Sequence, residues 1–232
     1  MYRLNQKTII AIDGGASVGK TTVSKNLSKI LNILYIDTGA MYRAYTLYFL
    51  NNNIELTDEN IINHLKDINV ELKMVDQSNV VYLNGKDVTS LIRTEEVSGA
   101  TSIVAKNKIL REKMVKKQRE MAGDKSIVIE GRDTTTVVFP NADIKLFLTS
   151  NIDTRAKRRY NDLLNMEKGK VLLQNVKDDM IKRDISDTSR KDSPLVKADD
   201  AIEIDTSNFD IETTTRVILD ILNKKGRLVI DD

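Results

Sequence analysis

The residues with the clearest chemistry lie near the start of the chain, between Gly14 and Thr22. Gly14, Gly19, Lys20 and Thr21 match the spacing G-x-x-x-x-G-K-[ST] of a phosphate-binding loop, or P-loop. Glycines allow backbone N–H groups to wrap a polyphosphate, and a helix that begins after Gly19 directs its N–H groups and positive dipole end at the anion. Lys20 supplies a charge for the β- and γ-phosphates, and the Thr21 hydroxyl is suited to ligate Mg²⁺. The residues expected to contact the bound polyphosphate are Gly14, Gly15, Ala16, Ser17, Val18, Gly19, Lys20, Thr21 and Thr22.

Apolar segments and helical patterns alternate along most of the chain. The pattern predicts strands over 8–12, 33–36, 126–129, 144–148 and 201–204, and helices over 21–31, 41–50, 57–66, 95–121 and 211–223. This alternation is typical of a parallel sheet covered by helices on both faces. In such sheets ligands bind beyond the carboxyl ends of the strands. Because Gly14, Asp37 and the segment 130–133 all follow predicted strands, we expect them to contribute to a common site.

Two segments interrupt the alternation. Residues 70–74 and 80–83 are predicted to form short strands around a turn at 77–79, with Asn84-Gly85 as a further turn signal. Residues 153–190 have a helical pattern and a high content of charged side chains. We expect this second segment not to fill a core and to act as a mobile lid that closes over bound substrates.

The composition excludes several classes of protein. Of 232 residues, 41% are hydrophobic and 30% are charged, as is typical of soluble globular proteins. The net charge of +2 gives no broad field for binding nucleic acid or an anionic membrane. The absence of cysteine excludes disulfides and thiolate metal sites, and a single histidine, His64, excludes histidine-rich metal clusters. No segment has the length of a membrane span. We expect a cytoplasmic protein, a monomer by default, without nucleic-acid or membrane partners.

A P-loop alone does not distinguish a switch, a motor and a kinase. The chain contains neither an N/T-K-x-D guanine-reading tetrapeptide nor a D-x-x-G element, which weakens a GTPase-like or regulatory nucleotide-binding module as the alternative. Arg43, Arg132, Arg183 and Arg190 lie at predicted strand ends or in the charged segment. Guanidinium groups bind phosphate bidentately, and one nucleotide does not need so many of them. A second anionic substrate explains the group, and a phosphate acceptor, already anionic near pH 7, needs no general base.

Longer motifs resemble a known family. They are Asp37–Arg43 (DTGAMYR), Ile92–Val97 (IRTEEV), Gly131–Asp133 (GRD), Thr136–Pro140 (TVVFP) and Lys182–Asp184 (KRD). With the P-loop, and in this order and spacing, they strongly resemble bacterial cytidylate (CMP) kinases over nearly the whole chain. The resemblance implies an α/β P-loop NTPase fold with a five-stranded parallel sheet flanked by helices. It also implies transfer of the γ-phosphate of ATP to CMP or dCMP, with Mg²⁺, giving CDP or dCDP.

The same resemblance implies a division of the chain and roles for its residues. A single kinase domain would comprise a core (about 1–66, 97–150 and 192–232), a β-rich NMP-binding insert (about 67–96) and a helical lid (about 151–191). The implied substrate-binding residues are Ser102, Arg111 and Asp133 for the cytosine, Arg183 and Asp187 for the sugar, Arg43, Arg132 and Arg190 for the acceptor phosphate, and Thr38. An exocyclic amine and ring acceptors suit these base-reading side chains. The implied catalytic residues are Lys20, Arg132 and Arg190, the metal-site residues are Thr21 and Glu130, and lid position alone adds Arg158 and Arg159 as ATP contacts.

The sequence departs from the family pattern at five positions. Gly15 stands where proline is common, Glu130 where aspartate is usual, and Thr135 where glycine is usual. Ser186 and Thr188 stand where the lid commonly carries more arginines. These differences concern the metal geometry and the contacts of the lid with ATP. The alternative within the enzyme class is a kinase for another nucleotide or small metabolite, and the side chains of Ser102, Arg111 and Asp133 would decide between them.

Overall fold

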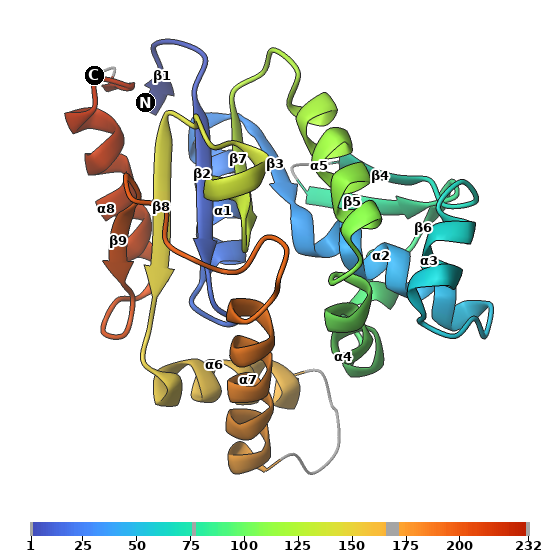
Figure 1. The fold of residues 1–232 in the computed structure, drawn as a ribbon. Coiled ribbons are helices and arrows are strands. Elements are labelled where there is room, and N and C mark those ends of the chain that lie inside the picture. Colours follow the sequence, from blue (N-terminus) through green and yellow to red (C-terminus); the bar gives the residue numbers. More distant parts are fainter. Residues whose placement is uncertain (1, 76–77, 166–171, 231–232) are drawn as a thin grey trace. The chain divides into compact units, whose positions relative to one another are not determined.

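The structure is a computed structural model that describes residues 2–75, 78–165 and 172–230 (Figure 1). Gln77 of the predicted turn and residues 166–171 of the predicted lid lie outside these described ranges. The chain divides into two compact units, residues 1–33 with 126–232 and residues 34–125. The first unit carries the P-loop and the charged segment, and the second carries the predicted β-rich insert. Across the part of the chain that is described, none of the helices combines the length and apolar character needed to cross a lipid bilayer.

A five-stranded sheet positions the P-loop, and its strands follow the order β3-β7-β2-β8-β9. The strands are β2 (Ile9–Gly14), β3 (Leu34–Asp37), β7 (Ile127–Gly131), β8 (Ile144–Thr149) and β9 (Ile202–Asp205). Strand β2 pairs in parallel with β7 on one side and β8 on the other, and β8 pairs in parallel with β9. Ile10, Ala11 and Ile12 in the central strand are fully buried, because both faces of the sheet are covered. The parallel α/β architecture predicted from the sequence is confirmed.

Two helices of the first unit follow the P-loop and close the chain. Helix α1 (Lys20–Leu31) packs against β2 and β7, and α8 (Ile211–Lys224) packs against α1. Val23, Leu27 and Leu31 of α1 and Ile218, Leu219 and Leu222 of α8 are buried. The Asp210 carboxylate accepts a hydrogen bond from Thr213 N at 2.7 Å at the start of α8. An antiparallel pair, β1 (Tyr2–Leu4) and β10 (Leu228–Ile230), joins the two ends of the chain. This pair was not predicted, because three-residue strands are too short to show an alternating pattern.

The charged segment forms two helices with a small core of their own. Helices α6 (Ile152–Asn165) and α7 (Leu173–Thr188) pack against each other, as the yellow and orange helices in Figure 1 show. The buried side chains between them are Ala156, Leu163, Val176 and Met180. These residues lie seven apart on α6 and four apart on α7, so each pair shares one helix face. The expectation that this segment fills no core was therefore wrong, since a few apolar residues at helical spacing suffice.

The second unit combines a small sheet with helices. It contains α2 (Thr38–Asn51), α3 (Asp58–His64), β4 (Val70–Val75), β5 (Ser78–Leu83), β6 (Lys86–Asp87), the 3₁₀ turn η1 (Leu91–Arg93), α4 (Glu95–Val104) and α5 (Lys108–Ala122). Strands β4, β5 and β6 form an antiparallel sheet, which confirms the predicted β-rich piece. The helical region predicted over 95–121 is confirmed as helical but consists of two helices, α4 and α5. Asn107 begins a new helix there: its side chain accepts a hydrogen bond from Leu110 N at 2.9 Å and donates one to Asp58 at 2.7 Å.

The core between α6 and α7 leads to a stability prediction. We expect Leu163→Ala to destabilise this helix pair by about 2–4 kcal/mol, because it leaves a cavity among buried side chains. Ile185→Ala on α7 is the matched control; the side chain is 60% exposed, so its truncation should change stability by less than about 0.5 kcal/mol. Hydrogen exchange of the α6 and α7 amides measures both effects. Equal exchange in the two variants would contradict a packed core between the helices.

Candidate active site

The P-loop occupies the turn between β2 and α1, where glycine is required twice. A Cβ atom at Gly14 would collide with the backbone carbonyl oxygen of Leu148 on the neighbouring strand. Gly19, immediately before α1, has a φ of 97°, in the left-handed region that other residues avoid. The residues between these glycines therefore turn sharply into the helix N-terminus, as a phosphate-wrapping loop requires.

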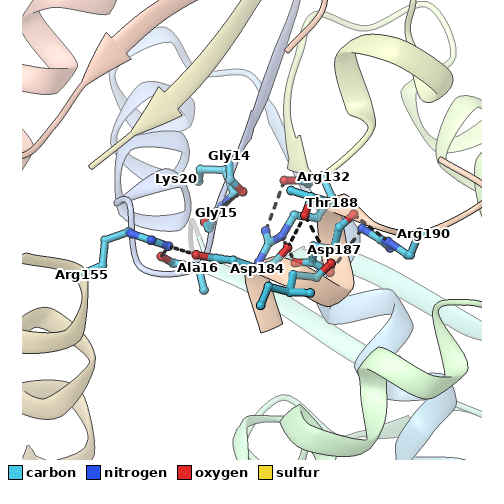
Figure 2. A network of polar contacts seen from close by, with 12 residues as sticks. Gly14, Gly15, Ala16, Lys20, Arg132, Arg155, Asp184, Asp187, Thr188 and Arg190 are labelled. Carbon is cyan, nitrogen blue, oxygen red and sulfur yellow. Dashed lines mark hydrogen bonds and ion pairs between the residues drawn. The ribbon is translucent and has the colours of Figure 1, made fainter. Parts of the chain in front are cut away.

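Lys20, the first residue of α1, is directed back toward the loop. Its side chain is buried (6% exposed), and Nζ donates hydrogen bonds to the carbonyl oxygens of Gly14 at 2.8 Å and Gly15 at 2.5 Å (Figure 2). Burial, together with the positive charge of Arg132, lowers the pKa of Lys20 to about 7, although the Glu130 carboxylate acts in the opposite direction. In this structure, the two loop carbonyl oxygens therefore accept the hydrogen bonds that the Lys20 amine is expected to donate to a phosphate oxygen.

Asp187 near the C-terminus of α7 binds two of the predicted phosphate-binding arginines. Arg132 Nε donates to Asp187 Oδ2 at 2.7 Å, and Arg190 Nη2 lies 3.3 Å from Asp187 Oδ1 (Figure 2). Burial alone would raise the pKa of Asp187, but Arg132 and Arg190 outweigh it and hold this pKa below its usual value. Conversely, burial alone would lower the pKa of Arg132, and the Asp187 carboxylate raises it above the usual range. The carboxylate therefore holds both guanidinium groups in place.

Other predicted residues of the first unit lie around this cluster. Arg183 on α7 is close enough for its charge to lower the pKa values of both Lys20 and Asp187. Glu130 is buried at the end of β7, and its charge raises the pKa values of Lys20 and Arg132. Asp133 is also buried, and it precedes a π-helical turn, η2 (Thr134–Val138). The structure thus brings the predicted residues at the ends of β2 and β7 together with those of α7.

One arginine that the sequence reasoning did not single out contacts the P-loop directly. Arg155 Nη1, on α6, donates to Asp184 Oδ2 at 2.6 Å and lies 3.5 Å from the carbonyl oxygen of Ala16 (Figure 2). A Cβ atom added at Gly15 would lie 3.0 Å from Arg155 Nη1. No local signal separates this arginine from its neighbours on the same charged helix, because its partner, Asp184, is contributed by another helix.

Arg158, predicted to contact the donor phosphates, holds a different loop in this structure. Its Nη2 donates to the carbonyl oxygens of Thr206 at 2.7 Å and Phe209 at 3.1 Å, in the segment after β9. The Thr206 hydroxyl in turn donates to the carbonyl oxygen of Val18 in the P-loop at 3.0 Å. Arg158 is therefore linked to the P-loop through Thr206. Its predicted phosphate contact, like that of the half-buried Arg159, stays a prediction.

The residues suited to a divalent cation are few. Thr21 is half-buried at the second position of α1, and Glu130 is buried at the end of β7. Within residues 2–75, 78–165 and 172–230, no group of three or more histidine, cysteine, aspartate or glutamate side chains is arranged to hold a metal ion. Such a donor set suits Mg²⁺, which keeps several waters and takes one or two protein ligands together with substrate phosphates.

The second unit positions another group of predicted residues around Asp37 and α2. Asp37 Oδ1 accepts a hydrogen bond from Ala40 N at 2.8 Å, while its Oδ2 lies 3.2 Å from Arg43 Nη2 and 3.4 Å from Arg93 Nη2. Thr38 is buried at the first position of the helix. Arg93 was not assigned a role from the sequence, although it belongs to the Ile92–Val97 motif. The carboxylate therefore caps α2 and binds two arginines at once.

The predicted base-reading residues of this unit lie on α4 and α5. Arg111 Nη1 donates to the carbonyl oxygen of Ala105 at 2.9 Å, and its guanidinium lies 5.3 Å from the ring centre of Tyr42. The Ser102 hydroxyl donates to the carbonyl oxygen of Gly99 at 3.0 Å. Arg111 is thus held by a backbone carbonyl and an aromatic face, which limits the directions available to its remaining donors.

The lowered pKa of Lys20 predicts proton uptake on nucleotide binding. At pH 8 a group of pKa about 7 is roughly one-tenth protonated, so binding of MgATP, which favours the ammonium form, should take up about 0.9 proton. The apparent affinity should therefore fall as the pH rises above 7. Calorimetry in buffers of different ionisation enthalpy measures the uptake, and Lys20→Met is the control. Equal uptake by the two proteins would contradict this role of the Lys20 amine.

Comparison with known proteins identifies the family of the chain. The family model described as cytidylate kinase matches residues 10–224. The cytidylate kinase of Geobacillus sp. (strain WCH70) is 46% identical over 93% of this chain and 96% of its own length. The cytidylate kinase of Lactobacillus johnsonii (strain CNCM I-12250 / La1 / NCC 533) is 46% identical over 97% of this chain and 97% of its own length. That of Bacillus subtilis (strain 168) is 42% identical over 97% of this chain and 100% of its own length. The chain belongs to the cytidylate kinase family.

Proposed function

We propose that this protein transfers the γ-phosphate of ATP to CMP or dCMP, giving ADP and CDP or dCDP. The observation that carries the proposal is the cluster in which the P-loop lysine, Lys20, lies within electrostatic range of Arg132 and Arg183, and Asp187 binds Arg132 and Arg190. This arrangement suits two polyanions that must approach each other. Membership of the cytidylate kinase family supports CMP or dCMP as the acceptor.

On the donor side, the P-loop amides from Gly14 to Thr22 bind the phosphates of ATP. The Lys20 amine exchanges the carbonyl oxygens of Gly14 and Gly15 for a phosphate oxygen. Its charge then neutralises the charge that develops during transfer, which is where most of the catalytic effect in phosphoryl transfer arises. Arg155, already beside the Ala16 carbonyl, adds a further guanidinium on this side.

On the acceptor side, the arginines exchange an internal carboxylate for the substrate phosphate. Arg132 and Arg190 bind Asp187 in this structure, and their donors are matched to the oxygens of a monophosphate. The acceptor oxygen of a nucleoside monophosphate is anionic near neutral pH, so no side chain has to remove a proton from it. Catalysis by these residues is therefore positioning and charge neutralisation.

The residues proposed to recognise the nucleoside are assigned from the sequence motifs in which they lie. We propose that Ser102, Arg111 and Asp133 read the cytosine, that Arg183 and Asp187 bind the sugar, and that Arg43 and Thr38 assist in binding the acceptor. Release of Asp187 from Arg132 by the incoming phosphate would make its oxygens available to sugar hydroxyls. This double use explains why one carboxylate is placed between two arginines.

The metal ion that the kinase family implies fits the residues present. The Thr21 hydroxyl and the Glu130 carboxylate would hold Mg²⁺. When bound, the ion supplies neutralisation of the phosphate charge. We also propose that the enzyme is a cytoplasmic monomer that uses small nucleotides and has no nucleic-acid or membrane partner.

A coupled assay across five monophosphates tests this function. With MgATP as donor, CMP and dCMP should give the highest kcat/KM, and UMP, AMP and GMP should be at least about tenfold poorer, because their base edges present the wrong donors and acceptors. The assay follows ADP release at saturating ATP. A preference for AMP or GMP over CMP would overturn the assignment.

A matched pair of lysine variants tests the role of the P-loop. Lys20→Ala should lower kcat by about 100-fold or more, since it removes charge stabilisation of the transferring phosphoryl group. Lys25→Ala on the same helix is the control, because Lys25 is exposed and its removal should leave kcat unchanged. Near-normal turnover by Lys20→Ala would contradict the proposed role.

A further inference from the structure

Asp13 is a buried carboxylate that the proposed mechanism does not use. It is 0% exposed and lies near the end of β2, immediately before the first glycine of the P-loop. Transfer of a carboxylate from water into a protein interior is costly unless hydrogen bonds replace the lost hydration. A carboxylate buried next to the P-loop must therefore be stabilised by the groups that surround it.

Two threonines surround the Asp13 carboxylate with four donors. Oδ1 accepts hydrogen bonds from Thr134 N at 2.9 Å and Thr134 Oγ1 at 2.8 Å. Oδ2 accepts hydrogen bonds from Thr135 N at 2.7 Å and Thr135 Oγ1 at 2.6 Å. Both threonines are as deeply buried as the aspartate. Four short bonds to an ionised acceptor in a dry environment form a stiff connection between segments 121 residues apart in the sequence.

This connection joins the two parts of the site. On one side, Asp13 is followed by Gly14 and the P-loop. On the other side, Thr134 and Thr135 directly follow Arg132 and Asp133, at the start of the turn η2. The strands themselves already pair in register, with Asp13 opposite Gly131, but that ladder ends before Arg132. The carboxylate therefore continues the link between β2 and β7 past the end of the sheet, where the proposed acceptor-binding side chains begin.

The charge of Asp13 acts on the same residues. Burial raises the pKa of Asp13, and the hydrogen bonds from Thr135 and Thr134 oppose this effect. The negative charge of Asp13 in turn favours the charged forms of Lys20 and Arg132. A side chain that aligns the two phosphate-binding segments thus also supports their positive charge.

We propose that Asp13, held by the hydroxyl and amide groups of Thr134 and Thr135, is a positioning residue that keeps Arg132 and Asp133 in register with the P-loop for phosphoryl transfer. The proposal rests on the proposed function above, because it assigns an acceptor role to Arg132 and Asp133. Asp13 contacts neither phosphate. It acts on the rate because small misplacements of donor and acceptor groups are costly in a reaction that depends on alignment.

The central experiment compares two substitutions of Thr135. Thr135→Val removes the hydroxyl donor and keeps the shape, whereas Thr135→Ser keeps the hydroxyl and removes a methyl group. We expect Thr135→Val to lower kcat by about tenfold and raise the KM for CMP, with the KM for ATP within about twofold of wild type, because the P-loop itself is intact. Thr135→Ser should retain kcat within about threefold. A role in packing alone would produce the opposite order of the two variants.

Asp13→Asn gives the larger effect and has a matched control. Asparagine at this position presents an NH₂ group to N–H and O–H donors, so kcat should fall by about 100-fold. The control is Asp143→Asn, since Asp143 Oδ2 accepts a hydrogen bond from Ile9 N at 2.8 Å at the opposite end of the same strand. It should cost stability and leave kcat unchanged. Circular dichroism melts on every variant give the fraction folded, by which each kcat is corrected.

The outcomes separate this inference from the function on which it rests. A wild-type protein that phosphorylates none of the five monophosphates overturns both. A wild-type enzyme active on CMP, with Thr135→Val unchanged or equal to Thr135→Ser, overturns the role of Asp13 alone. If Asp13→Asn fails to fold, the two Thr135 variants still decide the question, and a loss of kcat that vanishes after correction for the fraction folded also overturns it.

Discussion

The free protein satisfies the positive charges of its proposed phosphate site with its own oxygen atoms. Lys20 binds two carbonyls of the P-loop, and Arg132 and Arg190 share the carboxylate of Asp187. Without such partners, cations packed this closely in a buried region would repel each other and lose hydration. In the proposed function, each substrate phosphate replaces one of these internal acceptors, and the binding energy is the difference between the two contacts. The gain from this arrangement is that the side chains are in position before the substrate arrives.

The same principle organises the arginines outside this cluster. Asp37 binds Arg43 and Arg93, and Asp184 binds Arg155. In the case of Asp37, the carboxylate is itself fixed because its other oxygen caps helix α2. A guanidinium held by a carboxylate that the backbone fixes has few alternative positions. The loss of side-chain entropy on substrate binding is correspondingly small, since most of it has already occurred during folding.

The parts of the fold and site that could be predicted from the sequence are those that depend on residues close together in the chain. The spacing of Gly14, Gly19 and Lys20 identified the P-loop, and short apolar segments located the five strands. The division of the predicted helical region at Asn107 was missed, although the buried positions of α4 and α5 are out of phase across it and Asn107 is a typical capping residue. The four-donor cage of Asp13 and the contact of Arg155 with the loop were missed because each depends on partners far away in the sequence. Which partner a charged side chain binds depends on the tertiary structure and cannot be inferred from neighbouring residues in the sequence.

The glycine at position 15, where the family pattern commonly has proline, is explained by the side chains packed around it. Its backbone does not require glycine, since its φ lies outside the left-handed region that its neighbours Gly14 and Gly19 occupy. What glycine provides at this position is space: a Cβ atom would lie 3.0 Å from Arg155 Nη1 and 3.4 Å from Asp184 Oδ1. The ion pair between α6 and α7 can therefore lie directly against the P-loop. Any side chain at this position would require the Arg155–Asp184 pair to move away by a few tenths of an ångström. The residue at position 15 thus affects how closely α6 and α7 approach the P-loop in the free protein.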